Sequence, residues 1–349
     1  MTSTTIKNLQ PIAIEHIPCL PIDDLREKLV EDMATGKRVV QFFGDSVRDR
    51  INLYVVMADD AASTLSIMKT DFTANSGYAA LTPLMPAFHM FEREFFEQYG
   101  IEPAGHPWLK PVRRGIAGIS TEEKPYSFFN MAGDQIHEVG VGPIHAGVIE
   151  PGHFRFACFG EDIHHLEIQL GFQHRGVESL FIHHQHRPSY LLHLAESIAG
   201  DTVIGHTTAF ISAMEALRGI LISRRAQLIR SLMLELERIG NHIGDLSALA
   251  NDIAYLTGNA VFGALRTKVI NTSLSICGSR FGRGMIEYGG VNFDLDDRLI
   301  GEIKANLIKI EQDVDLASEV LFSSPSVLAR FEKTGVVSQQ TAKAIGLVG

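Results

Sequence analysis

Two stretches in the second half of the chain carry apolar residues at alternating spacings of three and four positions. The first consists of Ile229, Leu232, Leu236, Ile239, Ile243 and Leu246. The second consists of Leu299, Ile303, Leu307, Ile310, Val314, Ala317 and Leu321. Because a helix brings such positions onto one face, each stretch predicts a long helix with a continuous apolar side. We expect both helices to pack within one bundle.

The first hundred residues mix helical and strand patterns of shorter length. They favour a helix over 21–33, strands over 38–43, 51–57 and 64–72, and an aromatic helix over 88–99. Gly44-Asp45-Ser46 is expected to separate the first two strands, and Gly100 to end the second helix. The alternation predicts a small α+β domain.

The middle of the chain begins with a strand pattern and then becomes helical. Residues 154–159 and 163–170 predict a β-hairpin, with Leu166, Ile168 and Leu170 directed inward and Glu167 and Gln169 outward. Residues 174–186 are expected to form a helix that closes at Arg187-Pro188. The apolar run 203–223 predicts a further helix.

These patterns together predict an α+β protein with two domains. A small α+β domain over residues 1–119 is followed, over 120–349, by a mainly α-helical bundle with a small antiparallel β-sheet at its start. Residues 110–124, which are basic and flanked by prolines, are expected to link the domains.

Composition and charge exclude several classes of partner. A net charge of −10 argues against a nucleic-acid-binding surface. The three cysteines form no C-x-x-C pair, which fits a reducing compartment. Residues 1–10 lack the apolar segment of a signal peptide. The apolar run 203–223 contains His206, Glu215 and Arg218, so we expect no direct membrane span.

Eleven of the fifteen histidines lie between His137 and His206, so polar chemistry is concentrated there. His183, His184 and His186 lack the spacing of four that places two metal ligands on one helix face. His164 and His165 are adjacent, so a strand directs them to opposite sides. We interpret these five as polar surface or interface residues.

Two strings in this region identify a family. Residues 142–156 read Gly-Pro-Ile-His-Ala-Gly-Val-Ile-Glu-Pro-Gly-His-Phe-Arg-Phe, and residues 170–178 read Leu-Gly-Phe-Gln-His-Arg-Gly-Val-Glu. They resemble the large subunit of membrane-bound, energy-converting (group 4, formate hydrogenlyase type) nickel-iron hydrogenases, and the related hydrophilic D subunit of complex I. The hydrogenase branch is the closer match.

A second resemblance lies in the amino-terminal domain. Residues 91–101 read Phe-Glu-Arg-Glu-Phe-Phe-Glu-Gln-Tyr-Gly-Ile and precede Gly105-His106-Pro107. They resemble the C subunit (30 kDa type) of complex I, where this string lies on the partner-docking side; Glu92-Arg93-Glu94 could equally be a solvated helix face. The resemblances assign 1–119 to a C-like domain and 120–349 to a D-like domain without the family's C-terminal part.

The resemblance also shows which ligands this chain lacks. Where such hydrogenases carry Cys-Gly-x-Cys, two of their four nickel-iron ligands, this chain reads Ala199-Gly200-Asp201-Thr202. A methyl group and a hydroxyl do not replace thiolates as ligands of soft metals. We therefore expect no metal and no cofactor in this chain, and an iron-sulfur cluster in a partner subunit.

The resemblance implies a polar cleft near the replaced ligands. The 140–153 loop and the 201–206 turn are expected to converge there and to face a partner, with polar side chains around Asp201: His145, His174, Arg175, Glu178 and His206. The three-residue spacing of Arg175 and Glu178 also allows an ion pair on one helix face. The cluster would relay protons or fill the space of the metal.

Three functions are weighed on this basis. The expected one is a structural and coupling subunit of a complex I-like, membrane-associated oxidoreductase complex, beside an iron-sulfur small subunit and antiporter-like membrane subunits. It would lie in the cytoplasm, on the inner face of the cell membrane, through those partners. The alternative is a quinone-pocket subunit of an NADH dehydrogenase-like complex, because Tyr190 matches the family's quinone-site tyrosine, although the matching histidine position is Pro151. An active hydrogenase subunit is disfavoured by Ala199 and Thr202.

Overall fold

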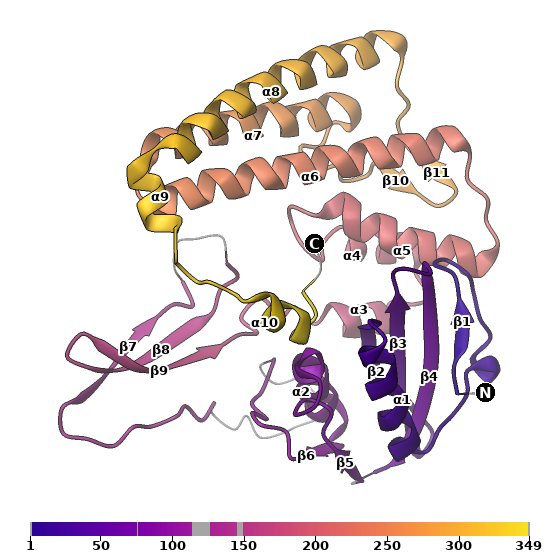
Figure 1. The fold of residues 1–349 in the computed structure, drawn as a ribbon. Helices are drawn as coiled ribbons and strands as arrows, with labels where there is room; N and C mark the ends of the chain where they lie inside the picture. Colours follow the sequence, from indigo (N-terminus) through magenta and orange to yellow (C-terminus); the bar gives the residue numbers. More distant parts are fainter. Residues whose placement is uncertain (1, 75, 114–125, 145–148, 348–349) are drawn as a thin grey trace. The chain divides into compact units, whose positions relative to one another are not determined.

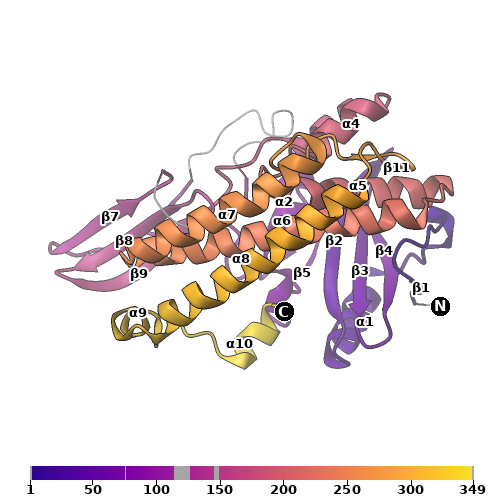
Figure 2. The same cartoon turned by 90° about the horizontal axis from the view of Figure 1, so that it is seen from above.

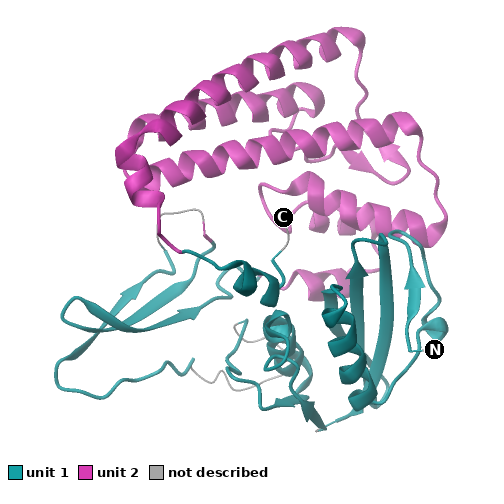
Figure 3. Cartoon of the chain, viewed as in Figure 1, with its two compact units in different colours: residues 1–145, 150–174, 336–349 teal, residues 146–149, 175–335 magenta. Residues whose placement is uncertain are grey.

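The computed structural model describes residues 2–74, 76–113, 126–144 and 149–347. The chain divides into two compact units, coloured separately in Figure 3. Unit 1 contains residues 1–145, 150–174 and 336–349, and unit 2 contains residues 146–149 and 175–335. The mixture of helices with small sheets confirms the predicted α+β class. The division into units differs from the expected domains, because the second sheet and the last residues group with the amino-terminal half.

Unit 1 is built on a four-stranded antiparallel sheet (Figure 1). Its strand order is β1 (Thr4–Ile6), β4 (Thr64–Thr73), β3 (Arg50–Asp59) and β2 (Arg38–Val47). Helix α1 (Ile22–Ala34) buries Leu25 and Leu29 in the same core as Leu53 and Met57 of β3. This confirms the predicted helix and all three predicted strands.

The end of β2 was predicted too early. Gly44, Asp45 and Ser46 continue the strand, and Gly44 pairs with Leu53 of β3. The glycine is needed for packing: a Cβ there would lie 2.2 Å from Cε2 of Tyr99, whose hydroxyl donates a 2.7 Å hydrogen bond to the Gly44 carbonyl. Glycine here allows close packing within the strand and does not mark a turn.

Helix α2 (His89–Tyr99) follows a short 3-10 turn, η2 (Pro86–Phe88), and ends at Gly100 as predicted. The alternative of a solvated helix face does not hold for Glu92 and Arg93, because both are buried. The Glu92 carboxylate accepts hydrogen bonds from the backbone of Leu81 (2.7 Å) and Thr82 (2.9 Å). It therefore fixes α2 to the loop that precedes it in the chain. This loop follows β5 (Gly77–Ala79), which pairs with β6 (Glu102–Ala104).

The first residues of the expected linker pack on α2. Arg93 donates to the carbonyls of Lys110 (2.6 Å) and Pro111 (3.0 Å), and Glu97 accepts from the N–H of Val112 (3.3 Å). Residues 110–113 are therefore part of unit 1 and do not act as a linker. The remainder of the predicted linker, residues 114–124, lies outside the described residues.

The second sheet of unit 1 has the order β7 (Ile136–Val141), β8 (His153–Phe159) and β9 (Asp162–Gln169), so the predicted hairpin gains a third strand. Its predicted inward face is wrong: Glu167 and Gln169 are buried, whereas Leu166 is 43% exposed. Glu167 accepts from the hydroxyl of Tyr126 (3.0 Å) and the N–H of Phe129 (2.6 Å). Side-chain and backbone donors thus offset the cost of burying this carboxylate.

Unit 2 is a helical bundle. Its long helices are α5 (Val203–Arg218), α6 (Arg224–Asp252), α7 (Leu256–Cys277) and α8 (Asp297–Ser323), and α7 lies beside both α6 and α8 (Figures 1 and 2). One core cluster contains both predicted apolar seams, which confirms the shared bundle. None of the helices in the described part of the chain is long and apolar enough to cross a membrane.

Shorter elements complete the architecture. Helix α3 (Val177–His183) is shorter than predicted, and Pro188 begins α4 (Pro188–Ala195) instead of ending the previous helix. Strands β10 (Ile286–Glu287) and β11 (Gly290–Val291) form a small hairpin between α7 and α8. The remaining short helices are η1 (Ile14–His16), α9 (Pro325–Phe331) and α10 (Gln339–Ala344).

Candidate functional site

The residues at the replaced thiolate positions lie directly before α5, in unit 2. Ala199 is partly buried, and Thr202 is the residue that precedes the first turn of the helix. The Thr202 carbonyl accepts the first hydrogen bond of the helix, from the N–H of His206 (3.2 Å). The Thr202 side chain makes no capping hydrogen bond, so the first N–H groups of α5 need another partner.

That partner is Glu237 of α6. Its two carboxylate oxygens accept hydrogen bonds from the N–H of Ile204 (2.7 Å) and the N–H of Gly205 (2.9 Å). A Cβ on Gly205 would lie only 3.1 Å from Oε1 of Glu237, so a glycine at this position permits the close approach. A negative charge at the beginning of a helix is also favoured by the helix dipole.

Several effects shift the pKa of Glu237 in opposite directions. Burial raises the pKa of Glu237 above its ordinary value, and the negative charge of Asp201 raises it further. The two backbone hydrogen bonds oppose this shift, because they favour the ionised form. The cavity wall therefore contains a carboxyl group whose proton affinity is increased by its surroundings.

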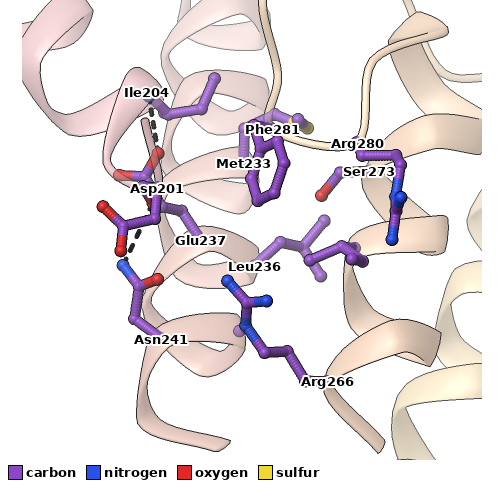
Figure 4. Close-up of a pocket in the computed structure, with 12 residues that line it drawn as sticks. Asp201, Ile204, Met233, Leu236, Glu237, Asn241, Arg266, Ser273, Arg280 and Phe281 are labelled. Carbon is purple, nitrogen blue, oxygen red and sulfur yellow. Dashed lines mark hydrogen bonds between the residues drawn. The ribbon is translucent and has the colours of Figure 1, made fainter. Parts of the chain in front are cut away.

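A small cavity that opens to solvent, with an accessible volume of about 20 Å³, lies beside this contact (Figure 4). Its lining comes from the beginning of α5 and the residues before it, from α6 and α7, and from the loop after α7. The lining residues are Asp201, Ile204, Met233, Leu236, Glu237, Gly240, Asn241, Arg266, Ile270, Ser273, Arg280 and Phe281. A mixed wall of this kind can hold a small polar ligand.

The loop after α7, which carries Arg280 and Phe281, is fixed to the rest of unit 2. The N–H of Gly284 donates to the buried Glu196 carboxylate at 2.6 Å. Gly282 has a φ of +75°, and a Cβ there would lie 2.4 Å from Cδ1 of Ile204. Glycine is therefore required both by the backbone and by the contact with α5.

The following hairpin is held by a buried ion pair. Glu215 of α5 and Arg230 of α6 meet through two hydrogen bonds of 2.8 and 2.9 Å. Arg230 also donates to the Gly290 carbonyl, and the N–H of Gly289 donates to Glu215. The pair thus supports the hairpin from two helices.

The residues predicted to surround Asp201 are placed as follows. His145 lies outside the described residues, and His174 is exposed in unit 1. Arg175 precedes α3 and donates a hydrogen bond to the carbonyl of Ile198, directly before Ala199. Because Arg175 is outside the helix, its spacing from Glu178 does not place the two on one helix face.

Asp201 itself is exposed at the cavity, where Glu237 and Asn241 also contribute to the lining. The Asn241 amide donates to the Asp201 carbonyl at 3.2 Å. Within the described residues, no hydrogen bond or ion pair joins the Asp201 carboxylate to Arg175 or to a histidine. His206 is half-buried on α5. The proposed relay therefore stays a prediction.

Tyr190, the candidate quinone-site residue, is 37% exposed on α4. Its ring lies 4.5 Å from that of His184, and the Arg187 guanidinium lies 5.5 Å from its centroid. The side chain is therefore part of a surface group of aromatic and basic residues and is not packed into the core.

Sequence reasoning missed Glu237, Asn241, Arg266 and Arg280. One signal was available for α6: Met233, Glu237, Gly240 and Gly244 recur at spacings of three and four, so glutamate and glycine share an inward face. Arg266 was missed because α7 was not predicted as a helix.

The donor set at this place does not fit a nickel-iron group. The residues at the two ligand positions are Ala199 and Thr202, which supply no thiolate. Cys277, at the end of α7, is buried, and burial raises the pKa of its thiol. Its sulfur contacts the carbonyls of Ser273 and Ser279 at 3.5 Å, as a protonated thiol would.

Two family models match the chain. Residues 27–115 match the respiratory-chain NADH dehydrogenase 30 kDa subunit, and residues 252–349 match the respiratory-chain NADH dehydrogenase 49 kDa subunit. Their order agrees with the C-like and D-like resemblances of the sequence.

Individual relatives include members of two types of complex. Hydrogenase-4 component G of Escherichia coli is 28% identical over 83% of this chain and 56% of its own length. The C/D subunit of the NADH-quinone oxidoreductase of Bacteroides thetaiotaomicron is 25% identical over 74% of this chain and 55% of its own length. The chain thus spans about half the length of these relatives.

One solved structure has a similar fold. The membrane-bound sulfane sulfur reductase, an archaeal respiratory membrane complex, contains a chain that matches with a TM-score of 0.55 and 22% identity, over 59% of this chain and 55% of that one. This chain therefore carries a 30 kDa-subunit domain and a 49 kDa-subunit domain of the respiratory-chain NADH dehydrogenase families, and it is homologous to subunits of membrane-bound hydrogenases and of complex I-like complexes.

Proposed function

We propose that this chain is a structural and coupling subunit of a complex I-like oxidoreductase complex and holds no nickel-iron group. The observation that carries the proposal is the combination found at the beginning of α5. Ala199 and Thr202 stand at the two thiolate positions, and the N–H groups that follow are bound by Glu237. Two N–H groups at this helix terminus are thus bound by a carboxylate of the chain itself.

The partners follow from the relatives. The relatives include hydrogenase and NADH-quinone oxidoreductase subunits, so we propose an iron-sulfur small subunit and antiporter-like membrane subunits as neighbours. Attachment through them would place this chain on the cytoplasmic side of the cell membrane. Its contribution would be to hold the electron-transferring partner against the membrane subunits.

Affinity purification of the tagged chain from membranes of its host, in mild detergent and without oxygen, tests this proposal. We expect co-purification of an iron-sulfur subunit, with iron and acid-labile sulfide in the complex, and of hydrophobic membrane subunits identified by mass spectrometry. A chain recovered alone, from extracts made without detergent, would contradict it. An unrelated soluble protein carrying the same tag is the control for non-specific recovery.

Tyr190 favours a second candidate, a quinone site in the assembled complex. Its exposed ring beside His184 could contact a quinone head group, because aromatic rings with a polar end suit such ligands. The test is a quinone-analogue titration of the purified complex and its Tyr190→Phe variant. Weaker binding in Tyr190→Phe but not in Tyr255→Phe, whose ring packs on the helical core, would favour the quinone function.

A further inference from the structure

We propose that the cavity beside α5 binds a small oxoanion, such as sulfate, between Arg266 and Arg280. This inference concerns unit 2 by itself and does not depend on the proposed function. It is carried by two arginines that line one cavity, the half-buried Arg266 and the exposed Arg280, and that have no ionic partner among the residues that the structure describes.

Arg266 is positioned by close helix packing. It lies on α7, and its side chain crosses α6 at Gly244, where a Cβ would lie 2.9 Å from Nε and 3.0 Å from Cδ of Arg266. The side chain is half-buried and lines the cavity (Figure 4). Its guanidinium makes no hydrogen bond or ion pair with any residue that the structure describes. The absence of a side chain at Gly244 thus leaves room for Arg266 to cross α6.

Arg280 reaches the same cavity from the loop after α7. It follows Gly278, which ends α7 with a φ of +73°, and precedes Gly282, which lies against Ile204. Its guanidinium likewise has no hydrogen-bonded or ionic partner among the described ranges of the chain. The backbone on both sides of Arg280 is therefore fixed, although the residue itself is exposed.

Ser273 adds a hydroxyl to this side of the cavity. The residue is 6% exposed, and within the described structure its hydroxyl makes no hydrogen bond. In Figure 4 it lies on the same side of the cavity as Arg280. A hydroxyl and two guanidinium groups together supply the donors that sulfate, phosphate and carboxylates require.

Two carboxylates in the same lining, Glu237 and Asp201, oppose the binding of an anion. Both oxygens of Glu237 are bound by N–H groups at the beginning of α5, where the helix dipole also offsets its charge. Asp201 is exposed and remains a source of repulsion. Favourable contacts are therefore concentrated on the Arg266 and Arg280 side, and the cavity size restricts the ligand to a few heavy atoms.

The first test is a sulfate titration of the full chain at constant ionic strength, with chloride as the replaced anion, followed by calorimetry. We expect saturable binding that weakens about tenfold or more in Arg266→Gln and in Arg280→Gln, because each loses a charge-assisted hydrogen bond. Arg224→Gln, at an exposed arginine outside the cavity lining, should bind like the parent. Equal binding in all four proteins, or none in the parent, would overturn the proposal.

A second pair of variants tests the positioning of Arg266 while keeping its charge. Gly244→Ala places a methyl group against the Arg266 side chain and should weaken sulfate binding. Gly301→Ala on α8 is the control and should not weaken it, because a Cβ at Gly301 would meet no neighbouring atom within 4 Å. Circular dichroism before each titration confirms that unit 2 is folded.

Crystals soaked in selenate locate the anion directly. An anomalous selenium peak between Arg266 and Arg280 is the expected result. A peak elsewhere overturns the assignment, and a peak here without saturable binding in solution shows an adventitious ion only, which also contradicts it.

Discussion

Glu237 on α6 accepts a 2.7 Å hydrogen bond from the backbone N–H of Ile204, at the beginning of α5. The four residues before this turn, 199–202, occupy the frame in which the resembled hydrogenases carry two thiolates. A carboxylate from a neighbouring helix therefore stabilises the turn that follows this frame. The contact gives two N–H groups at the beginning of α5 a partner within the chain.

Replacing Glu237 by alanine should destabilise unit 2. The substitution leaves the N–H groups of Ile204 and Gly205 without their partner, and losing such a cap costs about 1–2 kcal/mol in the free energy of unfolding. Urea denaturation followed by far-ultraviolet circular dichroism measures the change. Glu235→Ala, at an exposed glutamate on the same helix, should change it by less than about 1 kcal/mol. Equal effects of the two substitutions would refute the capping role.

The same carboxyl group predicts a pH dependence. Burial raises the pKa of Glu237 in the folded chain above its ordinary value of 4.5, so the folded state binds this proton more tightly than the unfolded state. The contribution of Glu237 to stability is therefore fully present below that value and is lost as the pH rises through the folded pKa. The parent should therefore lose stability relative to Glu237→Gln as the pH rises from about 4.5, as measured by the free energy of unfolding of each protein. A difference that grows with pH would contradict the raised pKa.

The buried pair of Glu215 and Arg230 should show the opposite dependence. Burial alone would raise the pKa of Glu215, but hydrogen bonds from Arg230 and Gly289 and the charge of Arg230 hold it below its ordinary value. Its contribution is therefore present above the unfolded pKa and is lost as the pH falls through the folded one.

Glu215→Ala leaves the Arg230 charge buried and should cost about 3–5 kcal/mol near neutral pH. The loss should diminish on acidification, as measured by denaturation at several pH values. A matched control is Asp313→Ala, which breaks the exposed pair with Lys268. If Glu215→Ala is no more damaging than this control, the buried pair does not support the hairpin.

Glu92 predicts a similar loss in unit 1. Its side chain is fully buried and accepts hydrogen bonds from Leu81 and from both the backbone and the hydroxyl of Thr82. Glu92→Ala leaves these donors unsatisfied and should cost at least about 3 kcal/mol.

The fluorescence of Trp108, the single tryptophan, reports the unfolding of unit 1, because the Arg93 guanidinium lies 5.0 Å from its ring. The control is Glu31→Ala, at a carboxylate that is 71% exposed on α1. An unchanged denaturation midpoint in Glu92→Ala would show that the loop does not depend on this carboxylate.

The long helices could be predicted because their buried positions are almost all aliphatic. The seams of α6 and α8 have an uninterrupted period, and the strands of the first sheet are rich in β-branched and aromatic residues. Helix α7 has a similar buried period, but Gly258, Thr272 and Ser273 occupy several of its positions. These small and polar residues interrupt the apolar period from which a helix is predicted.

The chemistry of the site could not be predicted in the same way. Glu92 and Glu237 each have a charged neighbour in the sequence, and Glu167 alternates with apolar residues as the outward face of a strand would. Each is partly or fully buried because backbone N–H groups from distant segments meet it. Such partners carry no sequence signal of their own, since every residue except proline has an N–H group. The family strings indicated the region of the site, but not its carboxylates and arginines.

The proposed role as a structural and coupling subunit depends most directly on the absence of a nickel-iron group in the assembled complex. The decisive measurement is elemental analysis of the complex purified without oxygen, with nickel expressed per copy of this chain. Because Ala199 and Thr202 supply no thiolate, nickel should be far below stoichiometric while iron from the partner subunit is present. About one nickel atom per chain would show that other ligands hold the metal and would contradict the account.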